Sequence, residues 1–148
     1  WRLLLGNTKI DTRFKDVEMI LRFFTLIEQW KGYKKPMNEF LTKYLSANKD
    51  DKKETVQNVF TETMSMLNSL IGKGAFVFEK SLNKAFFDAV SVGIGLCIQE
   101  SSLDKENLVK NFSTLKSNSE LKNLISDHTT DTKNLIRRIE IAYEIFSK

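Results

Sequence analysis

The stretch NKAFFDAVSVGIGLCIQ, residues 83–99, is almost wholly apolar between Ala89 and Ile98. Asparagine is a frequent N-cap residue, so Asn83 marks the start of a helix that we predict to run from residue 84 to about residue 99. A helix that is apolar on every side belongs in the interior of a fold. Small residues would let neighbouring helices approach it closely, and they are Ala89, Ser91, Gly93 and Gly95. We therefore expect this to be the central helix of the core.

The rest of the chain repeats its apolar residues with the 3.6-residue period of a helix, and no alternating pattern with hairpin turns is present. Further helices are expected at about residues 16–30, 36–45, 56–71 and 103–115, after a capping box at 117–120, and at 130–146. In the first of them the expected stripe is Val17, Ile20, Leu21, Phe24 and Ile27, and Phe23, Leu26 and Trp30 widen it, so this helix is expected to be covered on more than one side. The predicted fold class is all-α: a compact bundle of about six to seven helices around a buried central helix, with residues 1–148 as a single helical domain.

The composition is that of an ordinary globular chain, with 41% apolar and 28% charged residues among 148. Cys97 lies in the apolar stretch and is expected to be a buried thiol. The sequence has no cysteine pair, no signal peptide and no apolar run near 18 residues, which predicts a cytoplasmic protein without a membrane partner. The opening residues, WRLLLG, resemble the last turn of a helix whose beginning is missing. We therefore expect the chain to be an excised C-terminal part of a longer protein.

A catalytic site is not expected in this chain. Its single histidine, His128, lies in a polar linker without other ligand types at metal-binding spacing. Gly72-Lys73-Gly74 lacks the Gly-x-x-x-x-Gly-Lys-Ser/Thr spacing with which backbone amides surround a phosphate, so we interpret it as a helix stop. We expect no catalytic residue, no metal and no cofactor, and the chain alone is not expected to be an enzyme.

Charged residues precede and open the helix expected at 16–30. Asp16 and Glu18 fall in its first turn, where carboxylates interact favourably with free N–H groups and with the helix dipole. Glu18 and Arg22 are four residues apart, in the order that favours an ion pair. Asp11 and Arg13 precede the helix, and they either cap it or anchor this loop to another part of the protein.

Basic residues concentrate between positions 31 and 53, where seven lysines occur with three acidic residues. A lysine-rich surface can bind the phosphates of nucleic acid, so DNA is a possible partner. More often such a surface is a solvated face, and no known nucleic-acid-binding motif accompanies this one. The candidate nucleic-acid contacts are Lys31, Lys34, Lys35, Lys49, Lys52 and Lys53.

The pattern Asp11-x-Arg13-x-x-Asp16-x-Glu18-x-x-Leu21-Arg22-Phe23-Phe24 resembles the signature of the C-terminal helical region of GmrSD-type proteins. This bacterial family, a domain of unknown function, pairs an N-terminal ParB/sulfiredoxin-like domain with that helical region. Further matches follow the family order. They are Trp1-Arg2-x-Leu4-Leu5-Gly6, Phe40-Leu41, Asn83-x-Ala85-x-Phe87-Asp88-Ala89 and, after a threonine-rich linker, Arg138-Ile139-Glu140.

The resemblance implies a role in phage defence by modification-dependent restriction of foreign DNA. It places nucleotide hydrolysis or nuclease chemistry in other parts of the full-length protein, because the family's Asp-Gly-Gln-Gln-Arg and His-Asn-His motifs do not occur in this sequence. It also implies that this region couples to the missing N-terminal ParB-like domain of the same chain. The candidate coupling residues are Asp11, Arg13, Asp16, Glu18, Arg22, Asn83, Lys84 and Asp88.

Three hypotheses follow for the function. The leading one is a non-catalytic helical domain that packs on and regulates the nucleotide-dependent ParB-like domain. The alternative is a nucleic-acid-binding helical module that uses the lysine-rich face. A third, a self-contained enzyme, would require Asp16, Glu18 and Asp88 to converge in one pocket with shifted pKa values.

Overall fold

The computed structural model describes residue 1, residues 4–5 and residues 15–147. In this part of the chain there are seven α-helices: α1 (Lys15–Gln29), α2 (Met37–Ala47), α3 (Glu54–Leu70), α4 (Lys84–Gln99), α5 (Leu108–Ser117), α6 (Ser119–Ser126) and α7 (Thr132–Phe146). Two 3-10 turns, η1 (Trp30–Gly32) and η2 (Gly72–Gly74), follow α1 and α3. The predicted all-α bundle is confirmed.

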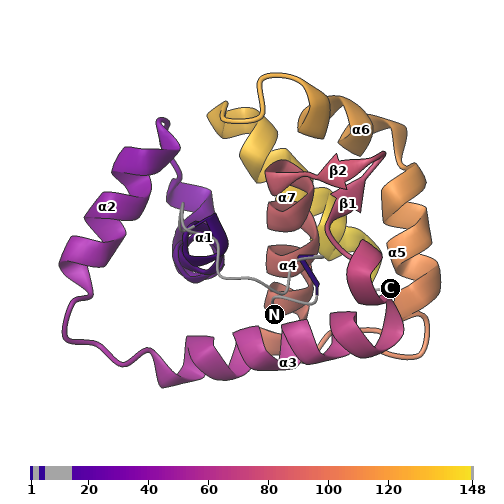
Figure 1. Cartoon of the computed structure of the whole chain (residues 1–148), viewed down its shortest axis with the longest axis horizontal. Coiled ribbons are helices and arrows are strands. Elements are labelled where there is room, and N and C mark those ends of the chain that lie inside the picture. The colour runs from indigo at the N-terminus through magenta and orange to yellow at the C-terminus, as the bar shows by residue number, and fades with distance from the viewer. Residues whose placement is uncertain (2–3, 6–14, 148) are drawn as a thin grey trace.

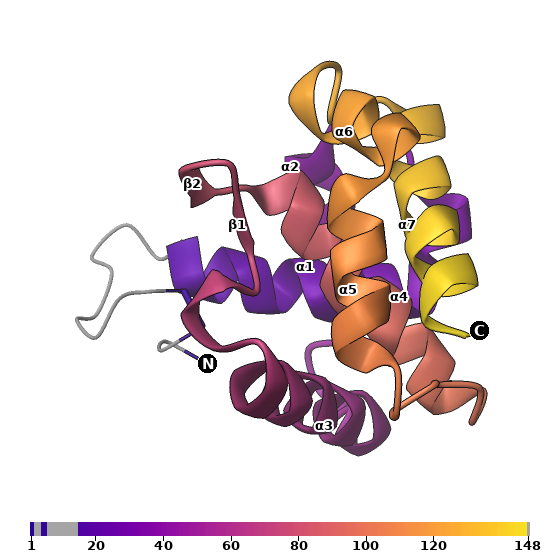
Figure 2. The same ribbon diagram turned by 90° about the vertical axis from the view of Figure 1, so that its right-hand side faces the viewer.

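Helix α4 lies at the centre of the bundle, as predicted. All of its residues from Ala85 to Cys97 are buried. Figures 1 and 2 show α7 running beside α4, with α1 and α3 on its other sides, and each of the three contacts it. Asn83 caps the helix, because its side-chain oxygen accepts a hydrogen bond from the backbone N–H of Phe86 at 2.9 Å. The boundaries and the burial of α4 therefore agree with the sequence pattern.

Two glycines allow α4 to approach its neighbours on two different sides. A Cβ atom added at Gly93 would lie 2.6 Å from the Cβ of Ala142 on α7. One added at Gly95 would lie 2.8 Å from Cδ1 of Ile27 on α1. Both distances are shorter than side chains tolerate, so the absence of a side chain sets these two helix-to-helix distances. The prediction of close packing at these positions is confirmed.

The buried face of α1 differs from the predicted stripe. Val17 is 52% exposed, and the face turned to the core contains Met19, Arg22, Phe23, Leu26 and Ile27. Phe23, Leu26 and Ile27 were predicted on the covered sides of this helix and are buried, whereas the burial predicted for Val17 is wrong and that of Arg22 was not expected. Arg22 enters the core to meet a buried carboxylate.

Three local predictions were also wrong. Val77–Phe78 (β1) and Ser81–Leu82 (β2) form an antiparallel hairpin that was not predicted. Its turn, Glu79-Lys80, lacks the glycine or asparagine that usually indicates a hairpin.

Helix α5 starts at Leu108 rather than at 103, since the side chain of Asp104 accepts a hydrogen bond from the backbone N–H of Asn107 in a turn. Helix α6 is capped by Asn118 rather than by Ser117, because the amide oxygen of Asn118 accepts the N–H of Leu121 at 2.8 Å.

Replacing Gly93 by alanine should lower the free energy of unfolding by about 1–3 kcal/mol, because the new methyl group overlaps Ala142 and forces α4 and α7 apart. Urea denaturation of the two proteins measures this difference. Gly74→Ala is the matched control, since a Cβ there meets nothing within 4 Å. Equal effects of the two substitutions would contradict the packing argument.

Candidate functional site

A single carboxylate, that of Asp88, lies in the core between three helices. Asp88 belongs to α4 and has 0% of its surface exposed. Its Oδ1 accepts a hydrogen bond from Nε of Arg22 at 2.9 Å, and its Oδ2 accepts one from Nη2 of Arg22 at 2.5 Å. Nη2 of Arg138 donates to the same Oδ2 at 2.6 Å. These three residues, here called the ion cluster, connect α1, α4 and α7.

Both arginines occupy core-facing positions of their helices, with 6% of Arg22 and 0% of Arg138 exposed. A helix buries residues spaced i, i+3, i+4 and i+7, and each arginine stands second in such a set. The sets are Met19, Arg22, Phe23 and Leu26 on α1, and Leu135, Arg138, Ile139 and Ala142 on α7. Arg138 was not among the predicted site residues. Its position within an apolar set was the signal that could have identified it.

The ion cluster has one positive charge in excess, because two guanidinium groups share one carboxylate. Burial alone would lower the pKa of Arg22, but the charge and hydrogen bonds of Asp88 outweigh burial and raise it. For Arg138 burial dominates, and its pKa is lowered despite the same carboxylate. Arg138 is therefore the less compensated of the two buried cations.

Arg138 also holds the loop that precedes α7. Its Nη1 donates to the carbonyl oxygen of Thr129 at 2.5 Å. The hydroxyl of the buried Tyr33 donates to the carbonyl oxygen of the next residue, Thr130, at 2.9 Å. These two bonds fix the loop beside the ion cluster. The Nε atom of Arg138 is buried and has no hydrogen-bond acceptor among the residues that the structure describes.

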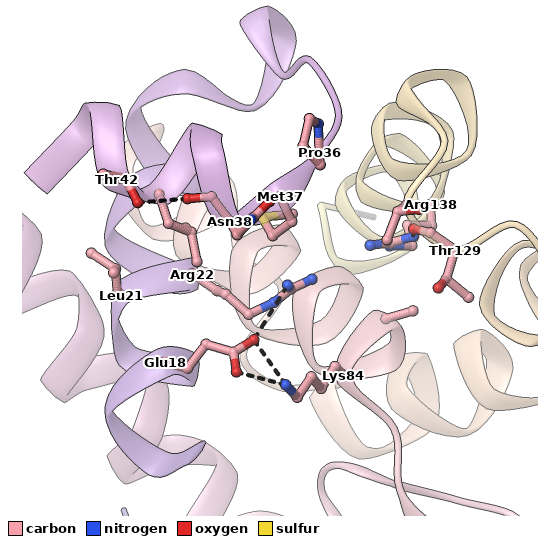
Figure 3. Close-up of a pocket in the computed structure, with 13 residues that line it drawn as sticks. Glu18, Leu21, Arg22, Pro36, Met37, Asn38, Thr42, Lys84, Thr129 and Arg138 are labelled. Carbon is pink, nitrogen blue, oxygen red and sulfur yellow. Dashed lines mark hydrogen bonds and ion pairs between the residues drawn. The ribbon is translucent and has the colours of Figure 1, made fainter. Parts of the chain in front are cut away.

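A pocket of about 670 Å³ lies next to the ion cluster (Figure 3). Its charged lining residues are Glu18, Arg22, Lys84 and Arg138, and Thr129 and Thr130 of the loop before α7 also line it. Its apolar lining residues are Leu21, Pro36, Met37, Leu41 and Ala85. Because α2 begins at Met37 and α4 at Lys84, the N-termini of two helices border the pocket.

Glu18 and Lys84 form an ion pair at the edge of the pocket. Nζ of Lys84 lies 2.8 Å and 2.7 Å from the two carboxylate oxygens of Glu18. Nη1 of Arg22 lies 3.8 Å from the same carboxylate, so the predicted Glu18–Arg22 pair is present but longer. Figure 3 shows the three side chains pointing toward one another from α1 and α4. Asp88 accepts hydrogen bonds from Arg22 and Arg138, so three cations meet two carboxylates in this region.

The structure brings together four of the eight predicted coupling residues: Glu18, Arg22, Lys84 and Asp88. Two of these four, Arg22 and Asp88, are buried, so they cannot contact another domain directly while the helices stay packed. The side chains of Glu18 and Lys84 are 38% and 43% exposed and are open to a partner.

The other four predicted coupling residues lie apart from the pocket or outside the described part of the chain. Asn83 is occupied as the cap of α4, and its amide group also donates to the carbonyl oxygen of Ile125 at 3.1 Å. Asp16 is buried, and its carboxylate accepts the backbone N–H of Val17 at 3.0 Å. Asp11 and Arg13 lie outside the described residues.

The predicted nucleic-acid contacts divide into two groups. Lys35 pairs with Asp131 at 2.7 Å, and Lys53 pairs with Glu28 at 2.9 Å, which reduces their attraction for phosphate. The exposed residues Lys31, Lys34, Lys49 and Lys52 form no ion pair within the part of the chain that the structure describes.

The residues named for the enzyme hypothesis have the following surroundings. Glu18 and Asp88 both contact Arg22, but each carboxylate is engaged by cations. The Cys97 thiol is buried as predicted, and burial raises its pKa to about 11. His128 is exposed beside Asp127.

Among the described residues, no group of three or more His, Cys, Asp and Glu side chains is arranged to hold a metal ion. Within the same ranges, none of the helices combines the length and apolar character needed to span a membrane.

Comparison with known proteins gives no relative. No protein-family model, no curated protein and no solved structure matches the chain.

Replacing Asp88 by asparagine should lower the free energy of unfolding by about 3–5 kcal/mol, because it removes the buried carboxylate that two buried guanidinium groups share. Urea or thermal denaturation measures this loss. The matched control is Glu120→Gln, which makes the same chemical change in the exposed ion pair with Arg137 and should have a much smaller effect. A stability loss at Asp88 no larger than at Glu120 would show that the buried arginines do not depend on the charge of Asp88.

Proposed function

We propose that this chain is a non-catalytic helical domain that packs on and regulates a nucleotide-dependent ParB-like domain in a bacterial DNA-restriction or phage-defence protein. The observation that carries the proposal is the convergence of residues from separate parts of the resemblance on one pocket. Glu18 and Arg22 come from its first block, Lys84 and Asp88 lie in or beside its central-helix block, and Arg138 comes from its last block. Residues 50 to 66 positions apart meet in the ion cluster, as expected if the blocks serve one common site.

In this proposal the ion cluster and its surroundings have different tasks. Asp88, Arg22 and Arg138 fix the relative positions of α1, α4 and α7. Glu18 and Lys84, the more exposed pair, are the side chains through which a partner domain would sense that arrangement. The chemistry of nucleotide hydrolysis belongs to the partner domain.

The alternative, a nucleic-acid-binding module, has one observation in its favour. The exposed lysines without an ion pair within the described ranges, Lys31, Lys34, Lys49 and Lys52, lie before and after α2 in the sequence. If they bound DNA, the affinity would fall steeply as salt rises, because each phosphate contact releases counter-ions.

The test is to introduce Lys84→Glu into the longer protein that carries the ParB-like domain. We expect its nucleotide hydrolysis to change by at least about fivefold, the lower range of an ordinary coupling free energy, while the melting temperature stays close to wild type. Lys73→Glu is the matched control, since it makes the same charge change on η2 and lines no part of the pocket.

Unchanged hydrolysis in the Lys84→Glu protein would contradict the regulatory proposal. If, in addition, the 148-residue chain bound duplex DNA with a steep salt dependence that Lys34→Glu and Lys52→Glu reduced, the nucleic-acid alternative would replace it.

A further inference from the structure

The pocket beside the ion cluster has the electrostatics of an anion site. Arg22, Lys84 and Arg138 line it, whereas only two carboxylates, those of Glu18 and Asp88, oppose them. Asp88 does not line the pocket, and both of its carboxylate oxygens accept hydrogen bonds from the two arginines, so its charge is directed at them rather than at the cavity. The excess positive charge is partly desolvated, and therefore attracts an anion more strongly than a surface cation does.

Helix orientation adds to this charge. The N-termini of α2, which has 11 residues, and of α4, which has 16, both border the pocket through Met37 and Lys84. A helix N-terminus carries a partial positive charge and free N–H groups, and phosphate groups bind there in many proteins. Two such termini at one pocket favour an anion over a cation or a neutral ligand.

A second, independent observation is the Nε atom of Arg138. It is buried and has no acceptor among the described residues, although the other two nitrogens of this guanidinium are bonded. An unsatisfied buried donor costs about 1–3 kcal/mol, more for a charged group, and such groups usually have a role that explains them. Arg138 lines the pocket, and in Figure 3 its guanidinium is turned toward the cavity.

The size and the apolar wall of the pocket indicate more than a single inorganic ion. About 670 Å³ is within the range of pockets for small organic molecules, which combine apolar walls with a few polar groups that fix the ligand. Leu21, Met37 and Leu41 supply apolar lining beside the cations. A ligand with one anionic end and one apolar or planar end would match both walls.

We infer that this pocket binds a small phosphate ester, with its phosphate group held by Arg22, Lys84 and Arg138 and its organic part against Leu21, Met37 and Leu41. The biological role of this binding rests on the proposed function. In that proposal, the bound ligand would change how Glu18 and Lys84 contact the partner domain. Phosphate binding itself is a property of the 148-residue chain and can be measured on that chain alone.

The experiment is isothermal titration of the 148-residue chain with adenosine 5′-monophosphate, inorganic phosphate and adenosine. We expect adenosine monophosphate to bind, inorganic phosphate to compete with it more weakly, and adenosine to show no binding at the same concentrations. If adenosine binds as well as its monophosphate, the anionic group is not recognised and the inference is overturned. The absence of binding by both phosphate compounds overturns it as well.

Two exposed residues of the pocket provide variants with opposite expected effects. Lys84→Ala should weaken the binding of adenosine monophosphate by about tenfold or more, the loss typical of a hydrogen bond to a charged group. Glu18→Gln should strengthen binding, because it removes a carboxylate that competes with the phosphate for Arg22 and Lys84. The control Lys73→Ala, outside the pocket, should leave affinity unchanged. If all three variants bind equally, the ligand is bound elsewhere and the assignment of this pocket is wrong.

An acidic side chain of a partner protein is the competing occupant. In that case the chain would bind neither phosphate compound, while Lys84→Glu would still alter hydrolysis in the longer protein. This pair of results would overturn the present inference and leave the proposed function standing. Phosphate binding without any effect of Lys84→Glu on hydrolysis would support the present inference and overturn the proposed function.

Discussion

A carboxylate in the middle of an apolar helix requires a cationic partner, and this requirement organises the structure. Asp88 is the only charged residue between Ala85 and Ile98. An isolated buried carboxylate is strongly unfavourable, so folding has to bring cations to it. Arg22 and Arg138 do so from two different helices, and each reaches the carboxylate only if its helix has one particular rotation and height along α4. The ion cluster therefore fixes how α1 and α7 pack, and the contacts at Gly93 and Gly95 permit the close approach that these bonds need.

The same arrangement links stability to the pocket. One carboxylate neutralises one guanidinium, so the second cation leaves a positive charge beside the cavity. A core made only for stability would not contain it, since well-packed apolar residues of similar volume are often as stable as a buried ion pair or more so. Buried charged networks that are not needed for stability are candidates for a functional role. In this protein the ion cluster, the two helix N-termini and the pair of Glu18 and Lys84 lie around one pocket.

Helices whose start, end and burial are determined by residues of one segment could be predicted from the sequence. Contacts between residues far apart in the sequence could not. Helix α4 was predicted because its composition and its cap, Asn83, lie within one segment. The burial of Arg22 and Arg138 was not predicted, because the carboxylate that both contact lies 66 and 50 positions away. Their places within apolar helical sets were a local signal of burial, but they did not identify the partner. The hairpin at β1 and β2 was missed because its turn has none of the usual residues. The motif residues were recognised by pattern, but only their arrangement around the pocket gives them a physical role.

The central claim is that Asp88 is in the core to compensate Arg22 and Arg138, and that the charges serve the pocket rather than the stability of the fold. The most direct test is the free energy of unfolding of the triple variant Arg22→Met, Asp88→Leu and Arg138→Met, measured by urea denaturation beside the variant Asp88→Asn. The account predicts that the triple variant, which has no buried charge left to compensate, lies within about 2 kcal/mol of wild type and well above Asp88→Asn. A triple variant as unstable as Asp88→Asn would contradict it, since the ion cluster would then be needed for the fold itself.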